Sequence, residues 1–138
     1  LVEHENGVDN NETTTPAAIS ANISSAQFDI DDGDRFSFVQ RVVPDITFEG
    51  STVSSPSATL SLIPYDSSGS GISDPTSEGG SNNASITRTA TSPVEKFTDR
   101  LDIRIRARQM ALKIESSNSG VLWQLGSPRI DIRADGRR

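Results

Sequence analysis

The stretch from Leu101 to Glu115 constrains the fold of this chain more than any other part of the sequence. Over residues 101–108 apolar side chains, Ala107 the last of them, alternate strictly with charged ones. A period of two residues is typical of a strand with one face buried and the other in water. From Met110 onward the apolar residues fall on even positions, and only Arg108 and Gln109 separate the two series. Because no Gly or Pro stands there to make a tight turn, we predict a bulge that redirects one long strand rather than a hairpin.

The rest of the chain shows similar alternation in shorter pieces separated by turn residues. Further strands are predicted at 35–43, 46–48, 58–62, 84–91 and 121–125, with a short last one around Ile130 and Ile132. Pro44, Pro64 and Pro93 are expected to interrupt or bend the chain, because proline donates no ladder hydrogen bond. With about seven or eight short strands spaced roughly 8–12 residues apart, the sequence predicts an all-β fold, an antiparallel, jelly-roll-like β-sandwich.

The predicted core consists of the apolar residues assigned to the inward side of these strands. They are Phe36, Phe38, Val42, Ile46, Phe48, Leu60, Leu62, Ile86, Leu101, Ile103, Ile105, Leu112, Ile114, Trp123 and Leu125. Val94 and Phe97 are expected to cover one end of the core. Trp123 alternates with Val121 and Leu125, so we interpret it as a core anchor rather than a platform for a sugar.

Two segments fall outside the strand pattern. Residues 1–27 are polar and acidic and are predicted to form an arm or connector to the sandwich domain, residues 28–138. Within the arm, Thr15 and Pro16 resemble a helix start, which predicts one short helix ending near Ser25. Residues 66–83 are dominated by Ser, Gly, Asp and Asn and predict a long loop, functional or disordered.

Composition and charge narrow the function classes. Apolar residues make up 33% of the chain, and no run approaches the ~18 apolar residues of a membrane-spanning helix. The absence of Cys excludes disulfides and thiolate metal sites. Residues 1–34 carry eight acidic side chains and no Lys or Arg, whereas residues 100–138 carry nine basic side chains against four acidic ones. Such an asymmetry can guide docking between subunits or attract a polyanion.

Neither catalysis nor metal binding is favoured by the residues present. His4 is the only histidine, so no Ser-His or Cys-His nucleophile can be assembled. A pair of carboxylates acting on a glycoside remains formally open, although the acidic residues fall in turns and on polar faces. The cluster Asp29, Asp31, Asp32 and Asp34 invites a calcium interpretation, but its spacing fits a turn better. We therefore predict no enzyme activity, no cofactor and no bound metal.

Arg104, Arg106 and Arg108 share one face of the predicted strand and are the candidate subunit-contact residues. One interpretation is an electrostatic patch for an acidic neighbour or for passing DNA. The other is a solvated sheet face whose arginines discourage unwanted strand pairing. No aromatic residue is interleaved with these arginines along the strand, which disfavours sequence-specific nucleic-acid recognition.

Several ordered motifs resemble a known family. They are Arg108–Leu112, Gly120–Gly126, Pro128–Arg133 and Asp135–Arg138, preceded by Asp32–Phe36 and Arg41–Asp45. Together they resemble the C-terminal end of a family of large structural tail proteins of bacteriophages, of the tail or nozzle type. The resemblance covers residues 28–138. Because the chain starts at Leu1 and its only methionine is Met110, we expect it to be the C-terminal portion of a longer polypeptide, with a processed or engineered start as the alternative.

The resemblance implies a function that composition and periodicity do not. The chain is expected to be a structural domain of a phage virion, located in the tail and packed in a ring of identical subunits. Its expected partners are further copies of itself and other phage tail or neck proteins. The alternative is a carbohydrate-binding or host-adhesion module of a tail fibre, which a β-sandwich would equally support. The supply of aromatic residues for a sugar site is small, with one Trp, one Tyr and five Phe.

Overall fold

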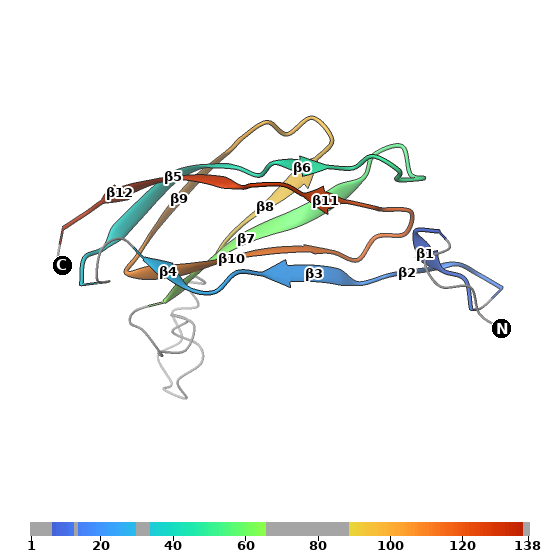
Figure 1. Cartoon of the computed structure of the whole chain (residues 1–138), viewed down its shortest axis with the longest axis horizontal. Helices are drawn as coiled ribbons and strands as arrows, with labels where there is room; N and C mark the ends of the chain where they lie inside the picture. The colour runs from blue at the N-terminus through green and yellow to red at the C-terminus, as the bar shows by residue number, and fades with distance from the viewer. Residues whose placement is uncertain (1–6, 13, 30–33, 66–88, 137–138) are drawn as a thin grey trace, which may run out of the picture.

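The computed structural model describes residues 7–12, 14–29, 34–65 and 89–136 of the chain (Figure 1). Within these ranges the backbone forms strands and no helix. The strands are β1 (Asp9–Asn10), β2 (Ala17–Ala18), β3 (Ala21–Ser24), β4 (Phe28–Asp29), β5 (Ser37–Val43), β6 (Ile46–Thr47), β7 (Ser57–Tyr65), β8 (Ala90–Glu95), β9 (Leu101–Ala107), β10 (Gln109–Ser116), β11 (Gln124–Leu125) and β12 (Arg129–Ala134). The predicted all-β, sandwich-like fold is confirmed.

Two antiparallel sheets enclose the core. The five-stranded sheet has the order β3-β10-β7-β8, and β4 pairs with the same edge of β10 as β3. The three-stranded sheet has the order β12-β5-β9. Two short pairs complete the fold: β11 with β6, and β1 with β2. In Figure 1 the β1–β2 pair lies at the right-hand end, where Asp9 accepts a hydrogen bond from the backbone N–H of Gly120 at 2.7 Å.

The chain changes sheets at Arg108. β9 pairs with β5 in the three-stranded sheet, whereas β10 pairs with β7 in the five-stranded sheet. β9 and β10 do not pair with each other, so the predicted redirection is correct and a hairpin is absent. The apolar series changes parity because the two halves face the same core from opposite sheets.

The core agrees with the sequence prediction except along β5. Eight predicted members are buried: Val42, Phe48, Leu60, Leu62, Leu101, Ile103, Ile105 and Ile114. Four more are partly buried against them: Ile46, Leu112, Trp123 and Leu125. Phe36 and Phe38 were assigned to the wrong face, because β5 turns Ser37 and Val39 inward. A register shift between Val39 and Arg41 then brings Val42 to the core. Ile86 and the loop 66–83 lie outside the described residues.

At the end of β8 only one of the two predicted cover residues is buried. Val94 is 1% exposed and belongs to the core, whereas Phe97 is 88% exposed. The side chain of Phe97 sits beyond the last residue of β8, in a turn, where no opposite sheet reaches it. The prediction for Phe97 is therefore wrong.

Of the three prolines expected to interrupt or bend the chain, only Pro44 follows the end of a strand. β5 ends before Pro44 as expected, but β7 continues through Pro64 and β8 through Pro93. β8 is an edge strand, and in the described chain β7 beyond Leu62 pairs with β10 alone. A proline is tolerated in such strands because its missing N–H can face the unpaired side.

The predicted helix ending near Ser25 is also wrong. Residues 21–24 form β3, which pairs with residues 113–116 at the edge of β10. Ile, Asn and Ser are weaker helix formers than Ala or Leu, and a sheet edge offers them ready backbone partners. Ile19 and Ile23, the expected apolar side of the helix, are half exposed.

Candidate interaction face

The outward side of the three-stranded sheet gathers half of the basic side chains of the described chain. We call this surface the arginine face. Its charged members are Arg41, Arg104, Arg106, Arg129 and Arg133, with Asp102 and Asp131. β9 builds it by strict alternation, because Leu101, Ile103, Ile105 and Ala107 point into the core and leave the intervening residues exposed. The arginine face therefore has an excess of positive charge.

Two rows of side chains cross the three strands of this face. Phe38 on β5 is paired with Arg106 on β9 and with Arg133 on β12. Arg41, further along β5, is paired with Asp102 on one side and Asp131 on the other. The first row alternates cation, aromatic ring and cation, and the second alternates carboxylate, guanidinium and carboxylate. Sequence reasoning missed the aromatic residue because it lies across the sheet from the arginines rather than along β9.

The structure gives the three predicted contact residues different surroundings. Arg106 Nε donates to Asp135 Oδ2 at 2.5 Å and Nη2 donates to the backbone oxygen of Asp135 at 3.2 Å. Its guanidinium also lies 4.0 Å from the centroid of the Phe36 ring. Arg106 is thus held by partners within its own chain, and we do not assign it to a partner molecule.

Arg108 stands at the change of sheet rather than on the open face. It is half-buried, and its guanidinium lies 5.1 Å from the Phe36 centroid. Among the described residues, its Nε is buried without a hydrogen-bond acceptor. Arg104 is exposed and has no ion-pair or hydrogen-bond partner in the described chain. Of the three, Arg104 is the side chain best placed to meet another molecule.

Apart from the Arg106–Asp135 contact, the ion pairs on this face are long and exposed. Arg41 and Arg100 approach Asp102 at 3.9 and 3.8 Å, and Arg133 approaches Asp131 at 3.9 Å. Side chains in these pairs are 40–67% exposed. Such pairs contribute only about 0–1 kcal/mol each, so they do not account for the stability of the sheet. They leave the face open to exchange these contacts for those of a charged partner.

The aspartate cluster considered for calcium is only partly described. Asp29 accepts a hydrogen bond at 2.7 Å from Nε2 of Gln109, the first residue of β10. Asp31 and Asp32 lie outside the described residues, as does His4. In the described ranges no three His, Cys, Asp or Glu side chains are grouped as metal ligands would be. Asp29 thus has a structural role in joining β4 to β10.

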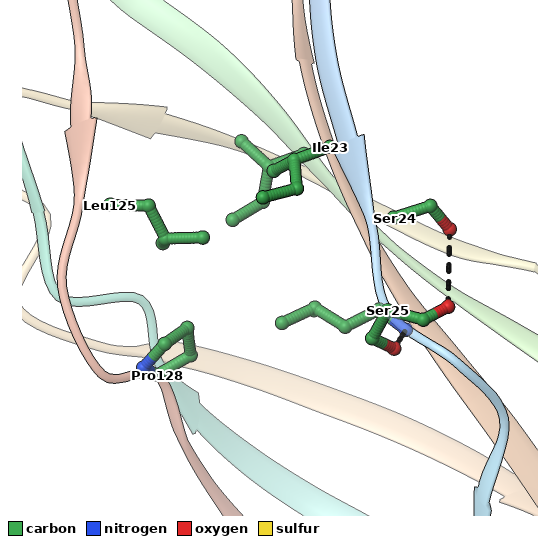
Figure 2. A pocket seen from close by; sticks show the side chains of 7 residues that line it. Ile23, Ser24, Ser25, Leu125 and Pro128 are labelled. Atoms are coloured by element: carbon green, nitrogen blue, oxygen red, sulfur yellow. Dashed lines mark hydrogen bonds between the residues drawn. The ribbon is translucent and has the colours of Figure 1, made fainter.

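Of the hollows that lie away from the arginine face, two have large apolar side chains in their walls. The first, which we call the apolar groove, has a volume of about 220 Å³ and lies between β3 and β10 on one side and β11 on the other (Figure 2). Its walls are Ile23, Ser24, Ser25, Leu112, Ile114, Leu125 and Pro128. Figure 2 places Ile23 across the groove from Leu125 and Pro128.

The second hollow, the tryptophan groove, has a volume of about 340 Å³ and opens beside Trp123. It is lined by Gly7, Val8, Ile19, Ala21, Asn22, Val121, Leu122 and Trp123. The indole Nε1 donates to Ser116 Oγ at 2.8 Å while part of the ring packs against the core. Trp123 therefore packs against the core, as predicted, and also borders an open groove.

Comparison with known proteins adds no family assignment. Neither a protein-family model nor a curated protein sequence matches this chain. In the part of the chain that the structure describes, there is no helix with the length and hydropathy needed to cross a bilayer.

Proposed function

We propose that this chain is a structural component of a bacteriophage tail and packs as one copy within a ring of identical subunits. The motifs over residues 28–138 that resemble phage tail proteins suggest the virion. The observation that carries the oligomeric part of the proposal is the arginine face, an exposed basic surface on one sheet of the sandwich. A surface of this kind, which folding does not require, is available for a partner of opposite charge.

The acidic N-terminal part of the chain is such a partner when it belongs to a neighbouring copy. Residues 1–34 contain eight acidic side chains and no Lys or Arg, so their charge is negative. In a head-to-tail ring every copy can offer its acidic segment to the arginine face of the next copy. Because exposed ion pairs are weak, this contact sets the register of the subunits rather than most of the affinity.

We expect the domain to have no catalytic activity. Some hydroxyl groups of the described chain are used in backbone contacts: Ser51 Oγ, for example, donates to the oxygen of Leu122 and accepts from its N–H. Among the described residues there is no histidine that could activate a serine or threonine, since the single histidine is His4. Several carboxylates bind an arginine or a backbone N–H group, as Asp135 and Asp45 do, and Asp29 binds the Gln109 side chain. These roles are structural.

A second candidate function, carbohydrate binding, is favoured by the tryptophan groove. An indole ring bordering a groove beside the Asn22 amide offers a stacking surface and hydrogen-bonding groups together. One variant distinguishes the two functions. Trp123→Ala should abolish glycan binding if the tryptophan groove is a sugar site, whereas ring formation through the arginine face should continue.

The proposal is tested by locating the chain in virus particles and by imaging the purified chain. Immunogold labelling of virions that encode the chain should mark the tail. Negative-stain class averages of the purified chain should show closed rings with one rotational symmetry. Gold on the capsid, or tail fibres labelled together with glycan binding by the purified monomer, would contradict the structural role and support the adhesion module.

A further inference from the structure

The apolar groove accepts a nonpolar side chain and offers nothing to a polar one. Its two serine hydroxyls already have partners within the chain. Ser25 Oγ accepts from the Leu112 N–H at 2.9 Å and donates to the Ala26 oxygen at 2.7 Å, and Ser24 Oγ bonds to the Ser25 oxygen at 3.5 Å. The rest of the lining is aliphatic, and Ile23 is 49% exposed. The groove is thus an exposed apolar surface that water covers in the isolated chain.

The most exposed large apolar side chain among the described residues is Phe97, at 88%. Phe97 lies in a turn over residues 95–98 that is closed twice by the same pair of residues. The Glu95 N–H donates to Thr98 Oγ1 at 3.0 Å, and the Thr98 N–H donates to the Glu95 oxygen at 3.0 Å. The nearest cation, Lys96 Nζ, is 5.9 Å from the ring centroid, at the outer limit of a cation–π contact. The turn therefore holds the ring out into solvent.

The groove and the phenylalanine lie at opposite edges of the same sheet. β3, which forms one wall of the groove, is an edge strand of the five-stranded sheet, and β8, which leads into the turn of Phe97, is the strand at the other edge. A ring at one edge cannot enter a groove at the other edge of the same molecule. We propose that Phe97 of one copy inserts into the apolar groove of a second copy.

The dimensions and symmetry agree with this contact. A dry apolar cavity of about 150 Å³ accommodates benzene, so a groove of about 220 Å³ has room for a phenyl ring. A protruding apolar residue that fits a pocket elsewhere on an identical molecule produces a head-to-tail contact, which repeats around a ring or along a filament. The contact rests on the proposed function in one respect, that the chain assembles with itself, and it supplies the apolar affinity that the arginine face lacks.

The absence of cysteine from the chain permits a direct test by site-specific cross-linking. A Lys96→Cys chain, which keeps Phe97 and places the thiol on its exposed neighbour in the turn, is mixed with an Ile23→Cys chain, oxidised by air with a copper catalyst, and analysed on a non-reducing gel. The control replaces Ile23→Cys by Ile19→Cys, which is equally exposed, at 50%, but does not line the groove. The mixture is kept at about 0.5 M salt, where charge pairs are screened beyond a few ångströms. We expect the mixture of the Lys96→Cys and Ile23→Cys chains to form a mixed dimer several-fold faster than the control mixture.

A second measurement follows self-association without cross-linking. Sedimentation velocity of a Phe97→Ser chain should show a dissociation constant for self-association raised by roughly 10- to 100-fold, the factor expected for exposing a phenyl side chain. Its melting temperature should be unchanged, because the side chain is exposed. If the Ile23→Cys and Ile19→Cys chains cross-link equally fast and the chain still self-associates, the insertion of Phe97 into the apolar groove is wrong. That result would not contradict the proposed ring. A chain that stays monomeric at low and high salt would overturn both.

Discussion

The two sheets of the sandwich are alike on their inward faces and different on their outward ones. Inside, both contribute aliphatic layers, such as Leu60 and Leu62 from one sheet and Ile103 and Ile105 from the other. Outside, the five-stranded sheet carries small and hydroxyl side chains, such as Ser61 bonded to Thr91 at 3.3 Å, and the Lys113–Glu115 ion pair. The three-stranded sheet carries the arginine face.

The difference between the two outward faces distinguishes the charged side chains that folding requires from those that it does not require. The five-stranded sheet shows that an outward face in this domain is stable with few charges. The arginines on the other sheet are therefore in excess of what folding demands, and an excess of one charge on an exposed surface is suited to a partner. Mutations on the inward faces should lower the free energy of unfolding, whereas mutations on the arginine face should weaken assembly.

The largest effect is expected in the core of the five-stranded sheet. Leu60→Ala removes a side chain that is fully buried and should lower the free energy of unfolding by about 2–5 kcal/mol. Thr59→Ala, its outward neighbour on β7, should change that free energy by less than about 0.5–1 kcal/mol. Urea unfolding followed by circular dichroism measures both. Similar losses for the two variants would mean that the outward face of this sheet is also packed against something.

A somewhat smaller effect is expected where β11 passes into β12. Gly126 donates its N–H to the Asp45 oxygen at 2.8 Å, and an added Cβ would lie 2.4 Å from Asp45 Oδ2, which accepts from the Ser127 N–H. Gly126→Ala should therefore cost about 1–3 kcal/mol, because the carboxylate must leave its position.

Gly136→Ala is the matched comparison for this glycine. Gly136 has a φ of +76°, but no atom lies within 4 Å of the added Cβ. The substitution should cost only about 1 kcal/mol, the backbone term of a left-handed residue. Thermal melts of the two variants compare the steric clash at Gly126 with the backbone strain at Gly136. A larger loss of stability for Gly136→Ala than for Gly126→Ala would contradict the clash with Asp45.

Trp123→Ala should destabilise the domain by about 2 kcal/mol, less than the ~3–5 kcal/mol of a fully buried aromatic residue, because the ring borders the open tryptophan groove. Ser116→Ala, which removes only the acceptor of the indole N–H, should cost about 0.5–1.5 kcal/mol. Guanidinium melts measure both losses. A Trp123→Ala variant as stable as the wild type would place the ring outside the core and favour the sugar-binding alternative.

The smallest stability effect is expected on the arginine face itself. Arg106→Ala loses the Asp135 bond and the contact with Phe36, which together should contribute about 0.5–1 kcal/mol at this exposed site. Arg104→Ala should leave the free energy of unfolding unchanged within about 0.5 kcal/mol. Urea unfolding distinguishes them, and a large loss for Arg104→Ala would show that this side chain is needed by the fold.

Strands in which apolar and charged residues alternate strictly were predicted correctly from the sequence. The prediction failed where pairing with neighbouring strands decides which face of a strand is buried. In β9 only one face is apolar, so its inward residues followed directly from the pattern. In β5 both faces carry apolar residues, and only pairing with β9 and β12 turns Val39 inward and Phe38 outward. The change of parity at Arg108 located the redirection, but periodicity gives the face of a residue and not the sheet to which it belongs.

The position of the arginine face could be predicted from the sequence, but the contacts that its side chains make could not. The exposure of Arg104 and Arg106 followed from alternation along β9. The partner of Arg106, Asp135, lies 29 residues away and meets it only because β12 and β9 flank β5. β3 was missed for the same kind of reason, because the edge of β10 outweighs the local preference of residues 15–25.

The central claim, that the arginine face is an assembly surface, is tested most directly by matched charge changes on the two outward faces. Arg104→Glu changes the net charge by two units on the three-stranded sheet, and Thr59→Glu with Thr91→Glu changes it equally on the five-stranded sheet. Sedimentation velocity at about 0.05 and 0.5 M salt measures self-association of each variant. The account predicts that Arg104→Glu weakens assembly at low salt by about tenfold or more, that the threonine variant does not, and that the difference shrinks at high salt. Equal behaviour of the two variants at low salt would contradict it and leave the arginine face merely solvated.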